Sequence, residues 1–246
     1  MLFVESCSNP NGVVFDFDTL RALKHSVPKL TVIVDNTWLT SAVFNPFTAS
    51  DAVDFVVTSL TKYYGAGRSG IAGAVMSRSS DDHKRLLEYG KVKGLHVSPL
   101  YCEAQLAVQP GLLSRVAQSS ATTQQLAVWL VQQGVEVSYP LLPQHPSHAL
   151  ACKYFARVPT ADGAVRQLGP SVLTVTIPLD RSAALKWMRS SAFGCSTSFG
   201  CGDSRFDQWP SRKNKRMTTC RFAVGFEDTL EDIVGEWERL LARVNG

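Results

Sequence analysis

Two short runs of β-branched and aromatic residues, each ending in a reactive side chain, constrain this sequence more than any other feature. The first run, at residues 31–34, leads directly into Asp35. The second, at residues 55–58, leads to Lys62 and then into a glycine-rich segment. Such runs are typical of buried strands. A loop with Asn45-Pro46 separates them. Along this part of the chain, expected strands alternate with helical segments, which favours an α/β fold with a mostly parallel sheet and crossover helices.

An aspartate and a lysine at the ends of neighbouring strands would lie where open α/β sheets bind ligands. This pair is the minimum set for pyridoxal phosphate (PLP): the lysine forms an imine with the aldehyde, and the carboxylate pairs with the pyridinium nitrogen. Lys62 is therefore the candidate catalytic residue, since its amine would also move the α-proton of a substrate. Asp35 is the candidate partner of the ring nitrogen. The hydroxyls of Ser59 and Thr61 are candidates for binding the phosphate group.

Four motifs then occur in a fixed order along the chain. They are Glu5-Ser-Cys-Ser-Asn9-Pro10, Asp35-Asn-Thr-Trp38 with Ser59-Leu-Thr-Lys62-Tyr63, Ser198-Phe-Gly-Cys-Gly-Asp-Ser204, and Arg221-Phe-Ala-Val-Gly-Phe-Glu-Asp228. Together they resemble the Cys/Met metabolism family of PLP-dependent enzymes, the cystathionine lyase and synthase group, over almost the whole chain. The resemblance implies an α/β fold. It would hold part of a fold-type I, aspartate-aminotransferase-like large domain and a smaller α+β C-terminal domain.

The resemblance also assigns residues to the substrate. Arg221 would bind the substrate carboxylate, for which a guanidinium offers bidentate contact. Ser198 would support the same carboxylate through its backbone, and Asn9 would reach it as well. The implied function is a PLP-dependent carbon–sulfur lyase or transferase acting on cystathionine-like sulfur amino acids, in a homo-oligomer (dimer or tetramer). The Asp-Asn-Thr-Trp motif favours the β-lyase branch, while γ-lyase, γ-synthase and sulfhydrylase activities stay open.

Family members carry a long further segment ahead of their Glu-x-Pro-x-Asn-Pro motif. That segment supplies a glycine-rich turn for the phosphate, a tyrosine that stacks on the cofactor, and residues that reach the neighbouring subunit's site. This sequence opens almost at the motif itself, with Glu5, so the resemblance implies that the segment is missing. An alternative function follows: an amino-truncated, catalytically silent homologue, or a partial subunit packed with a complete partner.

The pattern of strands and helices changes near residue 115. We expect a partial cofactor-binding large domain at 1–115, then a connecting helix and a small domain at 116–246. Expected strands lie at 2–5, 31–34, 55–58, 71–76, 135–139, 172–177 and 220–226. Expected helices follow an Asp18 cap, begin at Asp81, span 99–134 with a kink at Pro110, and span 183–189. A last helix follows a capping pair of Asp228 and Glu231.

The totals narrow the class of protein. The chain has 246 residues, is 45% hydrophobic and carries a net charge of +4. No apolar run approaches the roughly 20 residues of a membrane span, and the start does not resemble a secretory leader. The six cysteines lack paired spacing, which favours reduced thiols in the cytoplasm and no zinc or other metal. The basic cluster at residues 212–216 reads as solvated surface, so no nucleic acid is expected.

Overall fold

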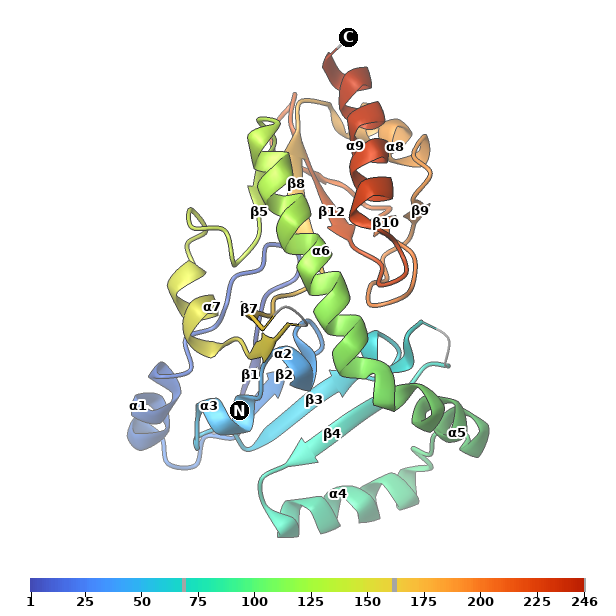
Figure 1. The fold of residues 1–246 in the computed structure, drawn as a ribbon. Coiled ribbons are helices and arrows are strands. Elements are labelled where there is room, and N and C mark those ends of the chain that lie inside the picture. Colours follow the sequence, from blue (N-terminus) through green and yellow to red (C-terminus); the bar gives the residue numbers. More distant parts are fainter. Residues whose placement is uncertain (68–69, 161–162, 246) are drawn as a thin grey trace.

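The computed structural model describes residues 1–67, 70–160 and 163–245. Within them the strands form a four-stranded sheet, a six-stranded sheet and a two-stranded hairpin. One long helix crosses from the first sheet to the second, as Figure 1 shows. No helix in this part of the chain is both long and apolar enough to cross a bilayer.

The amino-terminal half alternates strands and helices. Its elements are β1 (Leu2–Glu5), α1 (Thr19–Ser26), β2 (Val32–Asp35), α2 (Thr40–Val43), α3 (Pro46–Ala49), β3 (Phe55–Ser59), the 3-10 turn η1 (Tyr63–Gly65), β4 (Gly73–Ser77), α4 (Ser80–Lys93) and α5 (Pro99–Val108). The sheet order is β1-β2-β3-β4, with β1, β2 and β3 parallel and β4 antiparallel to β3. The predicted α/β architecture with a mostly parallel sheet is confirmed.

Parallel register brings the carboxyl ends of three strands together. Glu5 pairs with Asp35 across β1 and β2, and Asp35 pairs with Val57 across β2 and β3. Alternating burial along β2 places Val32 and Val34 in the core. Because Val32 and Val34 point into the core, the alternation along β2 leaves Asp35 outside the core at the carboxyl end of the strand.

The connection between the halves kinks where proline predicts it. The 3-10 turn η2 (Gln109–Gly111) separates α5 from the long helix α6 (Leu112–Gln132). Proline has no backbone N–H and interrupts helical hydrogen bonding. Along α6, Val116 packs into the amino-terminal core, whereas Leu126 and Leu130 pack into the carboxyl-terminal core. This helix therefore joins two hydrophobic clusters, and the division at residue 115 stays a prediction.

The carboxyl-terminal half is built on an antiparallel sheet. Its elements are β5 (Glu136–Ser138), α7 (His148–Tyr154), β6 (Arg157–Pro159), β7 (Val165–Gln167), β8 (Val172–Ile177), α8 (Arg181–Arg189), β9 (Gly194–Cys195), β10 (Arg205–Phe206), β11 (Ser211–Arg212), β12 (Thr218–Ala223) and α9 (Leu230–Asn245). The order is β5-β8-β12-β10-β9, with β11 beside β12. The hairpin β6-β7 lies apart from this sheet.

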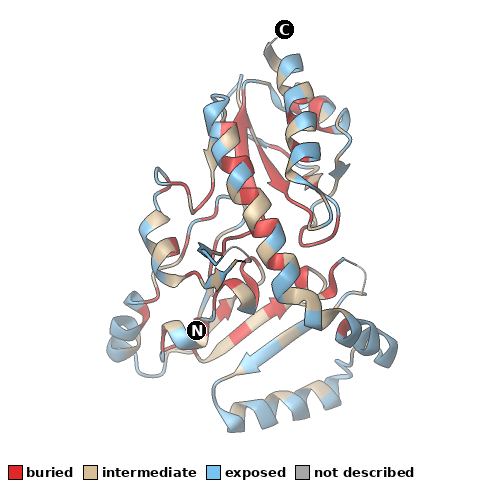
Figure 2. Ribbon diagram, in the orientation of Figure 1, coloured by how far each residue is buried: buried red, intermediate tan, exposed pale blue. Residues whose placement is uncertain are grey.

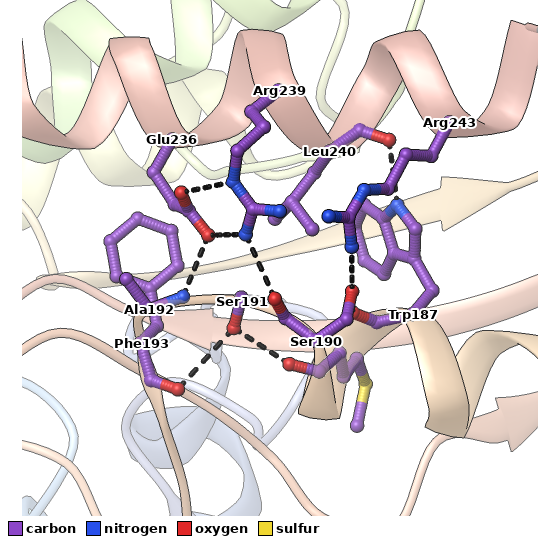
Figure 3. Close-up of polar contacts among 10 residues, drawn as sticks. Trp187, Ser190, Ser191, Ala192, Phe193, Glu236, Arg239, Leu240 and Arg243 are labelled. Atoms are coloured by element: carbon purple, nitrogen blue, oxygen red, sulfur yellow. Dashed lines mark hydrogen bonds and ion pairs between the residues drawn. The ribbon is translucent and has the colours of Figure 1, made fainter.

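Polar contacts fasten α8 to α9 (Figure 3). The indole N–H of Trp187 donates to the carbonyl of Leu240 over 2.8 Å, and Arg239 donates to the carbonyl of Ser190 over 2.8 Å. Glu236 accepts a hydrogen bond from the backbone of Ala192 over 2.7 Å. These bonds tie α8 and the segment after it to α9, and apolar residues of both helices pack in the hydrophobic cluster of the sheet.

Two predicted helix caps are wrong. Asp18 stands at the N-cap position just before α1, but its side chain makes no capping hydrogen bond, and its carboxylate pairs with Lys153 instead. At the start of α9 the capping pair is Thr229 with Asp232. Asp228 instead accepts a hydrogen bond from the backbone N–H of Ser204. In both cases a distant partner takes the carboxylate that local sequence would assign to the helix.

Two strands are displaced from their expected bounds, since β4 begins at Gly73 instead of residue 71 and β12 spans Thr218–Ala223 instead of 220–226.

The elements near β4 are strongly exposed, as Figure 2 shows. Neither β4 nor α4 contains a buried residue. Apolar side chains such as Ile71, Leu100 and Leu106 are 87, 73 and 72% exposed.

Candidate active site

A cavity of about 310 Å³ lies at the carboxyl ends of β1, β2 and β3. Its lining comes from both halves of the chain and consists of Glu5, Cys7, Asn9, Asp35, Thr37, Trp38, Ser59, Lys62, Thr197 and Phe199. Four of the residues predicted from the sequence, Asn9, Asp35, Ser59 and Lys62, therefore meet here. Parallel pairing of the three strands accounts for this convergence.

Lys62 lies half-buried at the cavity, between an alcohol and an aromatic ring. Its Nζ donates a hydrogen bond to Ser198 Oγ over 3.0 Å and lies 5.0 Å from the centre of the Phe199 ring. Burial lowers the pKa of Lys62, and the positive charge of Arg221 lowers it further. A lowered pKa favours the neutral amine, which is the nucleophilic form.

Asp35 is held at the end of β2 by a chain of hydrogen bonds. Its Oδ1 accepts from the backbone N–H of Thr37 over 2.8 Å, and Thr37 Oγ1 accepts from the backbone N–H of Ser59 over 2.9 Å. Thr37 thus joins the two strand ends that carry the predicted residues. It was not among the predicted site residues, although it stands inside the Asp-Asn-Thr-Trp motif.

Three of the predicted residues, Thr61, Ser198 and Arg221, are not part of the cavity lining. Thr61 makes its hydrogen bonds with the backbone instead. Its hydroxyl donates to the carbonyl of Ala72 over 3.3 Å and accepts from the N–H of Ala72 over 3.0 Å. The hydroxyl therefore fastens the segment after Lys62 to the segment before β4. Its role as a phosphate ligand stays a prediction.

Arg221 in β12 lies outside the cavity lining, is almost completely buried, and contacts two residues that line the cavity. Its Nη1 donates to Asn9 Oδ1 over 3.0 Å, and its Nη2 donates to the carbonyl of Thr197 over 2.6 Å. The same Nη2 lies 3.1 Å from Asp207 Oδ2 in an ion pair. Burial lowers the pKa of Arg221, while the Asp207 carboxylate opposes that effect.

Ser198 takes part through its hydroxyl. Its backbone N–H, which the resemblance assigned to a substrate carboxylate, donates to Ser196 Oγ over 3.2 Å. Its Oγ is free to contact Lys62. Because Lys62 and Ser198 are 136 positions apart, this contact depends on how the two halves pack.

An aromatic wall completes the site. The Phe199 ring lies 5.3 Å from Trp38 and 5.7 Å from Tyr63, measured between ring centres. Tyr63 is buried, and its phenol oxygen accepts a hydrogen bond from Ser171 over 2.8 Å. The sequence did not predict Phe199 as a site residue, because only the neighbouring Ser198 of the same motif was assigned a role.

The profile of one protein family, described as Cys/Met metabolism PLP-dependent enzymes, matches residues 1–240. The chain belongs to this family. The resemblance seen in the four motifs is confirmed.

Curated relatives have several named activities. A cystathionine beta-lyase from Neurospora crassa is 27% identical over 250 residues, covering 99% of this chain and 53% of its own length. An O-succinylhomoserine sulfhydrylase from Pseudomonas aeruginosa is 34% identical over 153 residues, covering 61% of this chain and 37% of its own length. The chain thus spans about half the length of the Neurospora relative.

Solved structures share the fold. A cystathionine gamma-lyase from yeast superposes with a TM-score of 0.86 and 22% identity, covering 99% of this chain and 64% of that one. A cystathionine gamma synthase from Xanthomonas oryzae pv. oryzae gives a TM-score of 0.84 and 20% identity over 99% of this chain and 63% of its own. These neighbours confirm the fold-type I assignment for the part of the fold that the chain spans.

The cavity of this family member has the donor set that PLP requires. An amine (Lys62), a carboxylate (Asp35) and a hydroxyl (Ser59) surround one cavity, and the amine has a lowered pKa. These groups suit an aldehyde, a pyridinium nitrogen and a phosphate, respectively. The residues present therefore fit the cofactor of the family.

Proposed function

We propose that this chain is a PLP-dependent carbon–sulfur lyase or transferase acting on sulfur amino acids of the cystathionine type. The observation that carries the proposal is the position of Lys62, whose amine faces a cavity shared with Asp35 and Ser59. Arg221, the proposed carboxylate-binding group, donates hydrogen bonds to Asn9 and Thr197, which both line this cavity. The names of the relatives support the same reaction class.

In this proposal each residue has one role around the cofactor. Lys62 holds PLP, Asp35 faces its ring nitrogen, and Ser59 contributes to its phosphate. Bound PLP supplies an electron sink for negative charge at the α-carbon of the substrate. The lowered pKa of Lys62 favours the neutral amine, which is the form that accepts the α-proton. Ser198 Oγ orients that amine through its 3.0 Å hydrogen bond.

The substrate carboxylate belongs at the Arg221 side of the cavity. Arg221 supplies the positive charge, and Asn9 presents an amide next to it. The 2.6 Å bond to Thr197 fixes the direction of the guanidinium. We further propose a homo-oligomer and, from the unpaired cysteines of the sequence, a cytoplasmic location. The proposal covers β-elimination, γ-elimination and replacement, with the β-lyase branch favoured by the Asp-Asn-Thr-Trp motif at residues 35–38.

The test is an absorption spectrum of the purified chain with added PLP, beside Lys62→Ala. We expect an absorption band at about 420 nm, where lysine-bound PLP absorbs, in the wild type only. Thiol release from cystathionine would then establish the reaction. A folded chain without a Lys62-dependent band would contradict the proposal.

A second candidate rests on the coverage of the relatives and on the exposed apolar face of β4, α4 and α5. The chain spans 53% of the Neurospora relative, and Ile71, Leu100 and Leu106 are open to solvent. A partial subunit that packs with a complete partner would cover such a face. This candidate predicts a Lys62-dependent band only after a full-length family member is added.

A further inference from the structure

One end of the Arg221 guanidinium, the Nη2 group, is already occupied by the protein itself. A guanidinium carries five N–H donors. In Arg221, Nη1 donates to Asn9 and Nη2 donates to the carbonyl of Thr197. Nη2 is also ion-paired with Asp207. The buried Nε has no acceptor among the residues that the structure describes.

A carboxylate can bind a guanidinium with both oxygens in two ways, through Nη1 with Nη2 or through Nε with Nη2. Both ways use Nη2. In Arg221 this atom already contacts two oxygens, Thr197 O at 2.6 Å and Asp207 Oδ2 at 3.1 Å. A bidentate ligand must therefore share Nη2 with one of them or displace it. The Thr197 oxygen belongs to the backbone, whereas Asp207 presents the same chemical group as the ligand.

Asp207 is fixed beside Arg221 by contacts of its own. Its Oδ1 accepts a hydrogen bond from the backbone N–H of Trp209 over 3.0 Å. Its backbone N–H donates to the carbonyl of Arg221 over 2.9 Å. The side chain is only 20% exposed. The carboxylate is therefore a built part of the site and not a mobile surface charge.

We propose that Asp207 is a positioning residue that sets the affinity of the site for a ligand carboxylate, because it holds Nη2 of Arg221 and offsets its charge. The identification of that ligand as the amino-acid substrate rests on the proposed function. Two other cationic side chains, Lys62 and Arg205, lie near this site. Burial lowers the pKa of Lys62, and the positive charges of Arg221 and Arg205 both lower it further. Asp207 is the carboxylate in direct contact with Arg221, and its charge repels an incoming carboxylate.

The direction of the effect follows from charge. Asp207→Asn keeps the size of the side chain and an oxygen beside Nη2, but it removes the negative charge. The attraction between Arg221 and a ligand carboxylate is then no longer opposed by a second carboxylate a few ångströms away. We expect about tenfold tighter carboxylate binding, from the size of Coulomb interactions at partly screened sites.

The test is a calorimetric titration with γ-(methylthio)butyrate, the carboxylate of methionine without its amino group. This probe cannot react with an aldehyde cofactor, so the titration needs neither PLP nor turnover. The neutral amide of the same acid is the matched control ligand, and we expect it to bind wild type and Asp207→Asn equally. Asp207→Glu retains the charge and is expected to stay within about twofold of the wild-type affinity.

A stability measurement separates positioning from a merely structural role. Asp207→Asn should melt at a lower temperature than wild type without ligand, because a buried arginine loses its counter-ion. Saturating probe should raise that melting temperature more than it raises the wild-type value. A structural role alone would lower both the melting temperature and the affinity.

Three results would overturn the inference. They are equal or weaker binding by Asp207→Asn, a gain that persists in Arg221→Met with Asp207→Asn, and no Arg221-dependent binding in either protein. The proposed function fails separately. A missing Lys62-dependent absorption band beside an intact tenfold gain would remove PLP chemistry and leave the role of Asp207.

Discussion

The two large sheets differ in how completely they are covered. All six residues of β8, an interior strand of the carboxyl-terminal sheet, are buried, whereas no residue of β4 at the edge of the amino-terminal sheet is. Figure 2 shows the same contrast between the two ends of the molecule. The carboxyl-terminal sheet is thus packed on its own, while the amino-terminal sheet is packed only around β1, β2 and β3. The candidate site lies on the packed side.

The largest expected effect tests the closed core. Trp237 in α9 is fully buried, with Trp187, Phe206 and Phe222 rings 5.4–5.6 Å away. Trp237→Ala should lower the free energy of unfolding by about 3–5 kcal/mol, since it leaves a cavity. Urea unfolding of the purified protein measures the loss.

The matched control for that change is Leu106→Ala in α5. Leu106 is 72% exposed, so its truncation should change the free energy of unfolding by less than about 0.5 kcal/mol. A loss comparable to that of Trp237→Ala would show that the α5 face is covered in solution. The contrast between the two sheets would then not hold.

An intermediate effect tests the junction between the halves. Tyr63→Phe removes the oxygen that accepts the 2.8 Å hydrogen bond from buried Ser171. Leaving that hydroxyl unsatisfied should cost about 1–3 kcal/mol. Tyr64→Phe is the control, because the Tyr64 phenol contacts Ser41 at an exposed position. Equal losses in urea unfolding would argue against Tyr63 as a link between the halves.

The smallest expected effect concerns the protonation of Lys62. Burial of the amine, and to a smaller extent the positive charge of Arg221, lowers the pKa of Lys62 below 10.5 in the folded protein. Between that lowered pKa and 10.5 the unfolded chain binds more protons, so folding stability rises with pH. Lys62→Met lacks this rise. It should be slightly more stable than wild type at neutral pH, with an advantage that shrinks as pH approaches 10.5.

Urea midpoints of wild type and Lys62→Met across that pH range measure the effect. Only the slope of the difference is diagnostic, because it is independent of how the methionine packs. A constant difference would mean that the Lys62 amine titrates alike in the folded and unfolded chains.

How much could be read from the sequence depended on the range of the contacts. Asp35, Ser59 and Lys62 were predictable as a group, because parallel strands bring their carboxyl ends to one edge. The contact between Asn9 and Arg221 joins residues 212 positions apart. Only the order of the motifs indicated it. Asp207 was not predicted, since its role arises from the antiparallel pairing of β10 with β12.

The wrong predictions share one physical cause. Asp228 was expected to cap α9 and Asp18 to cap α1, but Ser204 and Lys153 take those carboxylates instead. The Thr61 hydroxyl shows the same dependence on distant segments, since it bonds the backbone of Ala72, and its role as a phosphate ligand stays a prediction. Polar side chains choose among several partners, and the choice depends on segments that only the folded chain brings near.

The central claim is that Lys62 binds the cofactor. The most direct measurement is peptide mapping by mass spectrometry after the chain is incubated with PLP and reduced with borohydride. The account predicts a phosphopyridoxyl group on the peptide that contains Lys62. The yield of this label should be lower in Arg221→Ala, because the neighbouring positive charge that helps to lower the Lys62 pKa is gone. Label spread evenly over exposed lysines such as Lys84 and Lys91, with none at Lys62, would contradict it.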